Sequence, residues 1–319
     1  MKKILVIAGP TAVGKTKFAI EAAKAVDGEI VSCDSMQLYK YMDIGSAKPT
    51  PQELSQVRHH LVDIVDPAEP FSVALYQKMA NAAIEDIFSR GKIPIIAGGT
   101  GLYLNSLLYD MDFASAPCDM DLRKSLEKEA ELMGGDYLHK KLQEVDSQAA
   151  ERIHPNNIKK LIRALECANT GTNIKDFRAG GHKRKDYERN LIGLTRNRDE
   201  LYDRINKRVD ILVQQGLFKE VEELLERGLT EDDISMKGIG YKEIIGYFDG
   251  LYTKEQAIDL IKKNTRHLAK RQLTWFRRYE DMKWLNISDF AKEEDAVREM
   301  LLWLKNEFGF TTKVTNPTM

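Results

Sequence analysis

The first third of the chain alternates short apolar segments with longer amphipathic ones. The apolar segments are rich in β-branched residues, which predicts buried strands at residues 4–8, 29–32, 61–64 and 93–97. Helical apolar spacing follows at residues 15–26, and Ser72 can cap a further helix that runs to about residue 90. This order predicts a parallel sheet with right-handed crossovers, which binds ligands at the carboxyl ends of its strands.

The pattern changes in the middle of the chain. Residues 113–186 contain no convincing strand, and amphipathic or charged segments predict helices at residues 119–133, 137–145 and 157–169. Residues 191–195 are apolar again, as a buried strand requires. A sheet that is interrupted by helices and then resumes indicates a helical insertion, whereas two consecutive domains would leave the returning strand unexplained.

The rest of the chain is amphipathic and predicts helices at residues 198–215, 219–227, 241–248 and 254–279. We therefore expect an α/β fold in which a parallel sheet is flanked by helices and carries an all-helical insertion domain. The expected core domain with its C-terminal helices comprises residues 1–112 and 187–319, and the expected insertion comprises residues 113–186.

Composition limits the classes of protein that fit. A chain of 319 residues, 43% of them hydrophobic, can bury a large core, and the formal net charge of −1 means that any nucleic-acid surface must come from local clustering of its 48 Lys and Arg residues. Cys33, Cys118 and Cys167 are widely spaced, which favours reduced thiols over a zinc site or a disulfide framework. The sequence contains no signal-peptide pattern and no stretch long enough to span a bilayer. We expect a cytoplasmic protein without a membrane partner, and a monomer by default.

Residues 9–16 (GPTAVGKT) fit the phosphate-binding pattern G-x-x-x-x-G-K-[ST] without a mismatch, between a predicted strand and a predicted helix. The expected fold is therefore P-loop NTPase-like. Backbone N–H groups would cradle a phosphate or diphosphate, Lys15 would add a point charge, and the Thr16 hydroxyl could ligate Mg²⁺. A chance match in a glycine turn is the alternative, which the flanking strand and helix disfavour. The candidate binding residues are Gly9, Pro10, Thr11, Ala12, Val13, Gly14, Lys15 and Thr16.

Two further loops follow predicted strands and should face the same crevice. In the loop at residues 33–37, Asp34 is the best-placed carboxylate for a general base, while Ser35 and Gln37 can hydrogen-bond a polar ring. Asp34 can equally cap a turn, and the sequence leaves both roles open. The loop at residues 98–101 (GGTG) permits close backbone approach and adds the Thr100 hydroxyl, or else is simply a tight strand-to-helix turn.

The strand at residues 93–97 ends in Gly-Gly-Thr, where a P-loop hydrolase would carry an Asp that holds Mg²⁺. This ending disfavours a motor or a GTPase and leaves small-molecule kinases and unusual transferases.

Cations cluster on two predicted helices. Arg204, Lys207 and Arg208 can clamp a diphosphate or form a solvated face. The helix at residues 254–279 is strongly basic with interleaved aromatic residues, which suggests contact with a nucleic-acid backbone, although a charged helix is more often merely solvated. An apolar stripe at seven-residue spacing predicts its core-facing side: Ile261, Leu268 and Trp275.

Taken in order, these motifs resemble those of the bacterial-type tRNA dimethylallyltransferases, also called tRNA isopentenyltransferases. Two small departures are Val13, where a small polar residue is common, and Ser46, where threonine is frequent. The ordered set is far more specific than any single motif. The matching segments are residues 9–16, 34–39, 43–49, 98–103, 154–156, 163–166, 208–210, 238–243, 265–266, 269–272 and 274–277.

The resemblance implies transfer of the dimethylallyl group from dimethylallyl diphosphate to N6 of the adenosine 3′-adjacent to the anticodon of certain tRNAs. Asp34 would take the proton, Thr100 would help to hold the amine, and the P-loop with Arg208 and Mg²⁺ would bind the leaving diphosphate. The tRNA anticodon stem-loop would be the partner. The residues implied to contact tRNA are Asp34, Ser35, Met36, Gln37, Thr100, Tyr241, Lys242, Arg266, Lys270 and Arg271 in the core, and Arg123, Lys159, Lys160 and Arg163 in the insertion.

The competing interpretation is a P-loop small-molecule kinase, with the helical insertion as its lid. It would leave the basic helix and the Gly-Gly-Thr-Gly loop without a role. A non-catalytic RNA-binding module, a third class, would not explain a P-loop with Asp34 opposite it.

Overall fold

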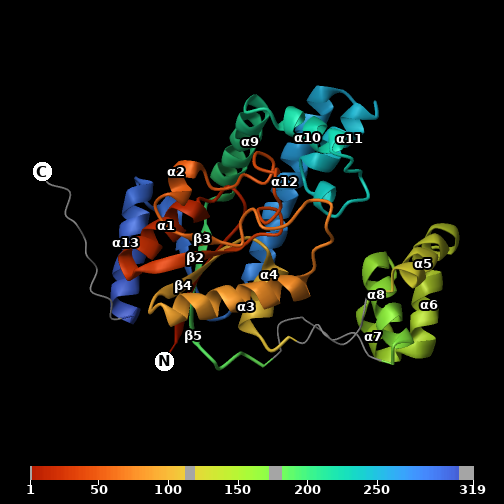
Figure 1. Ribbon diagram of the computed structural model, residues 1–319, viewed down its shortest axis with the longest axis horizontal. Helices are drawn as coiled ribbons and strands as arrows, with labels where there is room; N and C mark the ends of the chain where they lie inside the picture. Colours follow the sequence, from red (N-terminus) through yellow and green to blue (C-terminus); the bar gives the residue numbers. More distant parts are fainter. Residues whose placement is uncertain (1, 112–118, 172–181, 309–319) are drawn as a thin grey trace, which may run out of the picture. The chain divides into compact units, whose positions relative to one another are not determined.

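The computed structural model of the protein describes residues 2–111, 119–171 and 182–308 (Figure 1). Its contacts divide the chain into two compact units. The first unit combines Met1–Tyr109 with Lys183–Met319, and the second is Asp110–His182. The second unit overlaps the insertion expected at residues 113–186, with its limits a few residues earlier at each end.

The first unit contains a six-stranded, fully parallel sheet with the strand order β3-β2-β4-β1-β5-β6. Strand β1 lies in the centre, where Val6 pairs in register with Ile96 of β4 and Leu191 of β5. Its residues are almost entirely apolar because helices cover both faces of a parallel sheet. The strands are β1 Lys3–Ala8, β2 Gly28–Cys33, β3 His59–His60, β4 Ile93–Gly98, β5 Glu188–Thr195 and β6 Met282–Asn286.

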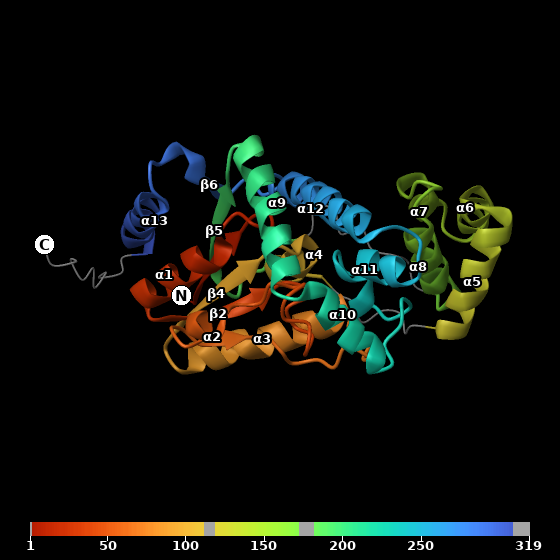
Figure 2. The same cartoon turned by 90° about the horizontal axis from the view of Figure 1, so that it is seen from above.

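Helices cover both faces of this sheet. One face presents Leu5, Ile7 and Ile95 to a core that includes residues of α1, α9, α12 and α13. Helix α3 lies on the opposite side of the strands from α9 (Figure 2), begins at the predicted cap Ser72, and packs on β2 and β4. The helices of this unit are α1 Lys15–Val26, α2 Pro51–Leu54, α3 Val73–Ser89, α4 Gly101–Leu108, α9 Arg198–Gln214, α10 Leu217–Glu226, α11 Tyr241–Phe248, α12 Lys254–Phe276 and α13 Glu293–Phe308.

The second unit is all-helical in its described part and has a hydrophobic core of its own. Asp119 caps the first helix by accepting the N–H groups of Asp121 and Leu122. Leu138, Leu142 and Leu161 are fully buried at the centre of that core. The helices are α5 Met120–Met133, α6 Gly135–Val145, α7 Ser147–Arg152 and α8 Ile158–Asn169.

Most of the predicted helices and strands are present in the structure. The strand predicted at residues 61–64 is wrong: strand β3 stops at His60 because Leu61 and Asp63 have left-handed φ values of 62° and 57°, which an extended strand does not allow. Strand β6 and the helices α2, α4, α7 and α13 were not predicted. The buried face of α12 also differs from the expected stripe, since Leu268 and Trp275 are only half-buried.

No helix in the described ranges is both long and apolar enough to cross a membrane. Cys33 and Cys167 are buried, whereas Cys118 lies outside the described residues.

Candidate active site

The phosphate-binding loop joins β1 to α1, and cationic side chains bind its carbonyl groups. Lys15 Nζ donates to the Pro10 carbonyl at 2.8 Å, Arg204 Nε to that of Ala12 at 3.1 Å, and Arg196 Nε to that of Val13 at 3.1 Å. In a trans peptide group the C=O and the N–H point in opposite directions. The N–H groups of Val13 and Gly14 therefore point away from the two guanidinium groups that bind the Ala12 and Val13 carbonyls. This orientation suits an anion site at the helix N-terminus.

Gly14 occupies the last position before α1 with a φ of 113°. A side chain would be strained in that conformation, so the glycine of the motif is required by the backbone.

Two half-buried cations, Lys15 and Arg208, and the Asp34 carboxylate determine the electrostatics of the site. Burial lowers the pKa of the Lys15 ammonium to about 8; the Asp34 charge opposes this shift, and the Arg208 charge adds to it. Burial also lowers the pKa of Arg208 from its ordinary value, again against the attraction of Asp34. Desolvated cations stabilise a bound anion strongly because little water screens them. The arrangement therefore favours a polyanionic ligand beside a carboxylate.

The loops after β2 and β4 meet as predicted. The Thr100 N–H donates to the Cys33 carbonyl at 3.0 Å, and the Ser35 N–H donates to Thr100 Oγ1 at 3.0 Å. Gly98 is required at this junction, because a Cβ there would lie 2.1 Å from the Cys33 carbonyl oxygen. The carboxyl ends of neighbouring parallel strands share one edge of the sheet, which is why the sequence could predict this meeting.

Asp34 is half-buried in this junction and makes one local hydrogen bond. Its Oδ1 accepts the N–H of Met36 at 2.9 Å, so the turn-capping role that the sequence left open is present. Asp34 also acts electrostatically on Lys15 and Arg208, so the same carboxylate faces the candidate anion site.

Gln272 of α12 bridges two of the loops and was not predicted as a site residue. Its Oε1 accepts the Thr11 N–H at 2.8 Å, and its Nε2 donates to the Gly99 carbonyl at 3.0 Å. A Cβ on Gly99 would lie 2.4 Å from that Nε2, so the glycine leaves room for the amide. The Thr11 N–H, expected to face a phosphate, is therefore engaged by the protein. The only signal in the sequence was the position of Gln272 inside a family-like motif.

Gln37 and Arg208 meet at one backbone carbonyl. Gln37 Nε2 donates to the Ala47 carbonyl at 3.3 Å, and the Arg208 guanidinium approaches the same oxygen at 3.5 Å. The Ser32 hydroxyl donates to Gln37 Oε1 at 3.2 Å. The candidate base-reading residue and the candidate diphosphate clamp are thus positioned by the same loop.

Comparison with known proteins places this geometry in a family. The family model described as IPP transferase matches residues 37–279, and the one described as isopentenyl transferase matches residues 2–67. The chain belongs to the IPP transferase family. The tRNA dimethylallyltransferases of Alkaliphilus oremlandii and Acetivibrio thermocellus are 51% and 50% identical to it, over 97% and 95% of this chain and 99% and 98% of theirs.

Solved structures of the family have the same fold. The full-length tRNA isopentenylpyrophosphate transferase of Bacillus halodurans is 43% identical, with a TM-score of 0.73 and 97% of each chain covered. A eukaryotic dimethylallyltransferase acting on tRNA is 28% identical, with a TM-score of 0.83 over 99% of this chain and 82% of that one. Membership of the IPP transferase family argues against the kinase interpretation.

The cations predicted on the core of this IPP transferase differ in exposure. Lys242, Lys270 and Arg271 are exposed, whereas Arg266 is half-buried and donates to Asn206 Oδ1 of α9 at 2.6 Å. Lys270 and Arg271 therefore remain the best candidates for RNA contact on α12.

Tyr241 lies in the interior of the first unit and not on its surface. It is fully buried, and its hydroxyl donates to Glu220 at 2.8 Å. The prediction that Tyr241 contacts tRNA directly is wrong for this structure, because the residue contributes no surface. The motif containing it is structural at this position.

The predicted insertion cations fall into two groups. Arg123 donates from Nε and Nη2 to the buried Glu166 carboxylate at 2.9 and 2.8 Å, and Arg163 donates to the same carboxylate at 3.2 Å. Arg123 thus links α5 to α8, whereas Arg163 pairs with Glu166 within α8. Lys159 is exposed and Lys160 is half-buried in the first turn of α8, so they are the stronger candidates for phosphate contact.

Proposed function

We propose that the protein transfers the dimethylallyl group from dimethylallyl diphosphate to N6 of the adenosine 3′-adjacent to the anticodon of certain tRNAs and releases diphosphate. The observation that carries this proposal is the electrostatic interaction of Asp34 with the half-buried cations Lys15 and Arg208. A proton acceptor and a diphosphate site must adjoin when an amine displaces an allylic diphosphate. The names of the relatives support the same reaction.

The P-loop would bind the leaving group. Lys15, Arg208 and the loop N–H groups stabilise the negative charge that develops on the diphosphate as the C–O bond breaks. The allylic carbon can carry positive charge, so neutralising the diphosphate assists its departure.

Mg²⁺ fits the residues at this site. Thr16 lies in the first turn of α1, directly after Lys15, and the described ranges contain no cluster of three His, Cys, Asp or Glu side chains suited to a metal. The ion would take its oxygen ligands from the Thr16 hydroxyl, the diphosphate and water, a donor set that Mg²⁺ prefers. When bound it would supply further charge neutralisation to the leaving group.

Asp34 would act on the acceptor amine. A neutral aryl amine is too weak an acid for a carboxylate to deprotonate in advance. The proton instead moves to Asp34 as the N–C bond forms and the nitrogen becomes acidic, while the C–O bond breaks. The Thr100 hydroxyl, which already bonds the Ser35 N–H, would help to hold the amine.

The target base would have to leave the anticodon-loop stack, as other base-modifying enzymes require. Ser35, Met36 and Gln37 would border the position where it enters, and Gln37 would read its edge. Lys159, Lys160, Lys242, Lys270 and Arg271 would contact phosphates of the stem-loop. We expect a cytoplasmic monomer.

One assay tests the proposal against a kinase. Labelled dimethylallyl diphosphate or labelled ATP is supplied with bulk tRNA, and the tRNA nucleosides are analysed by mass. The proposal predicts N6-dimethylallyladenosine in tRNA and no stoichiometric consumption of ATP. Movement of the ATP label without prenylated nucleoside would overturn it.

A further inference from the structure

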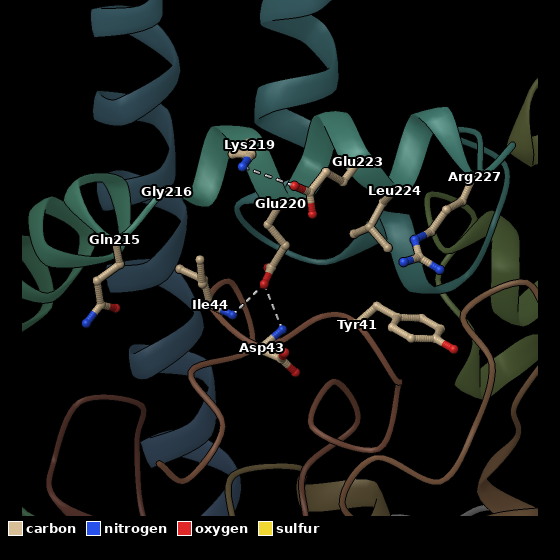
Figure 3. Close-up of a pocket in the computed structure, with 10 residues that line it drawn as sticks. All are labelled: Tyr41, Asp43, Ile44, Gln215, Gly216, Lys219, Glu220, Glu223, Leu224 and Arg227. Carbon is tan, nitrogen blue, oxygen red and sulfur yellow. Dashed lines mark hydrogen bonds and ion pairs between the residues drawn. The ribbon is translucent and has the colours of Figure 1, made fainter. Parts of the chain in front are cut away.

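The loop at residues 43–47 is held at its start by a single carboxylate (Figure 3). Glu220 of α10 is only 8% exposed. Its Oε2 accepts the N–H groups of Asp43 at 2.8 Å and Ile44 at 2.6 Å, and its Oε1 accepts that of Gly45 at 2.9 Å. Three successive backbone N–H groups make a concave anion site, and here the protein's own carboxylate fills it.

Tyr241 completes this arrangement. Its hydroxyl donates to Glu220 Oε1 at 2.8 Å, and burial together with the Glu220 charge holds the pKa of Tyr241 well above its ordinary value, so the hydroxyl remains a donor. A Cβ on Gly45 would lie 2.5 Å from the Tyr241 ring, so the ring packs closely against the backbone. Four donors satisfy the buried Glu220 carboxylate, and these bonds together fix the conformation at the start of the loop.

The other end of the loop reaches the candidate active site. The Ala47 N–H donates to the Ile44 carbonyl at 2.9 Å, which links the end of the loop to the residue that Glu220 binds. Ala47 has a left-handed φ of 48°, a conformation that a non-glycine residue keeps only when its surroundings hold it. Its carbonyl is the oxygen approached by both Gln37 and Arg208.

We propose that Glu220 is a positioning residue which, through the backbone of residues 43–47, orients Gln37 toward the acceptor base and Arg208 toward the diphosphate. The inference rests on the proposed function. Glu220 acts through the Ala47 carbonyl and not on the reacting atoms.

Glu223, also drawn in Figure 3, provides a matched control for substitution of Glu220. Glu223 lies on the same helix and lines the same groove of about 320 Å³, but its side chain is 56% exposed and pairs with Lys219 at 3.5 Å. Glu220→Gln keeps the shape but removes the charge and turns an amide toward backbone donors. We expect kcat/KM for tRNA to fall by about ten- to a hundredfold in Glu220→Gln and by less than about twofold in Glu223→Gln.

A double-mutant cycle separates positioning from general destabilisation. In a Gln37→Ala background the target of Glu220 is partly absent, so the cost of Glu220→Gln should shrink at least about threefold. A merely structural role would cost the same factor in both backgrounds. If Glu220→Gln does not fold, Tyr241→Phe removes one donor, keeps the ring on Gly45, and should give the same pattern at smaller size.

The outcomes are distinguishable. A wild-type enzyme that prenylates no tRNA would overturn the proposed function. An active wild type with equal costs in both backgrounds, or a Glu220→Gln variant that matches Glu223→Gln, would overturn the positioning role alone.

Discussion

One substitution separates the turn-capping role of Asp34 from its proposed role as proton acceptor. Asp34→Asn keeps an oxygen for the Met36 N–H, so the turn is retained, but the amide cannot take a proton. Turnover should fall by about two to four powers of ten, as is usual for the loss of a general acid–base group, while diphosphate binding changes little. Single-turnover prenylation of full-length tRNA measures this loss. A variant with wild-type turnover would leave Asp34 as a turn cap only.

Lys15 should make diphosphate binding depend on pH. In the free protein its pKa is about 8, and a bound diphosphate would raise it by stabilising the ammonium. Binding then takes up a proton above that pH. The contribution of Lys15 should therefore raise the dissociation constant by up to about tenfold per pH unit above pH 8 and leave it unchanged below. Titration calorimetry with inorganic diphosphate measures this dependence.

Lys15→Met is the control for that experiment. The variant binds weakly but shares the ionisation of the ligand, so the difference between the two pH curves isolates Lys15. Parallel curves for wild type and variant would remove Lys15 as the titrating group.

At the scale of elements, α12 should bind RNA through its exposed cations. Neutralising Lys270 and Arg271 to Gln should weaken tRNA binding and reduce the slope of log affinity against log salt by about one unit or less for each phosphate that is no longer neutralised. Arg298→Gln with Lys305→Gln removes the same charge from exposed positions of α13 and should leave the slope unchanged. A solvated α12 would give equal slopes for both pairs.

The opposite side of α12 should act on the donor site. Gln272→Met keeps the length of the side chain but loses the bonds to the Thr11 N–H and the Gly99 carbonyl. The two loops lose their bridge, so diphosphate affinity should fall by about tenfold. Thr274→Ala, at an exposed position of the same helix, is the control. Equal affinities in the two variants would show that the bridge does not shape the donor site.

At the scale of the molecule, the second unit should be separable from the first. Tyr109 and Lys183 form an antiparallel bridge, and the Asp110 N–H donates to the His182 carbonyl at 2.9 Å, so the two ends lie together. Replacing residues 111–181 by a short Gly-rich turn should leave a folded core, since each unit has its own hydrophobic cluster.

That shortened protein should bind diphosphate with wild-type affinity and bind tRNA more weakly, because the cations of α8 are gone. Thermal unfolding and filter binding measure the two properties. A core that unfolds would contradict the expected independence of the two units. A core that binds tRNA as tightly as wild type would contradict the expected contribution of the second unit to tRNA binding.

Short-range sequence patterns predicted many of the secondary-structure elements of this protein. The helix expected at residues 15–26 is α1 Lys15–Val26, Ser72 caps a helix where expected, and the helix expected at residues 119–133 is α5 Met120–Met133. Periodicity, caps and glycine turns act between residues a few positions apart, so the sequence shows them directly. The meeting of three loops at one edge was also predictable, because it follows from parallel strands.

Only the tertiary structure decided which distant residues complete the site. Gln272 bonds the Thr11 N–H across 261 residues of sequence, and Glu220 bonds the Asp43 N–H across 177. Strand β6 likewise is a strand because residues 282–286 pair with β5. Such contacts depend on how elements pack, which no local pattern encodes. The family resemblance likewise placed Tyr241 among the implied RNA contacts, whereas packing buries it against Glu220.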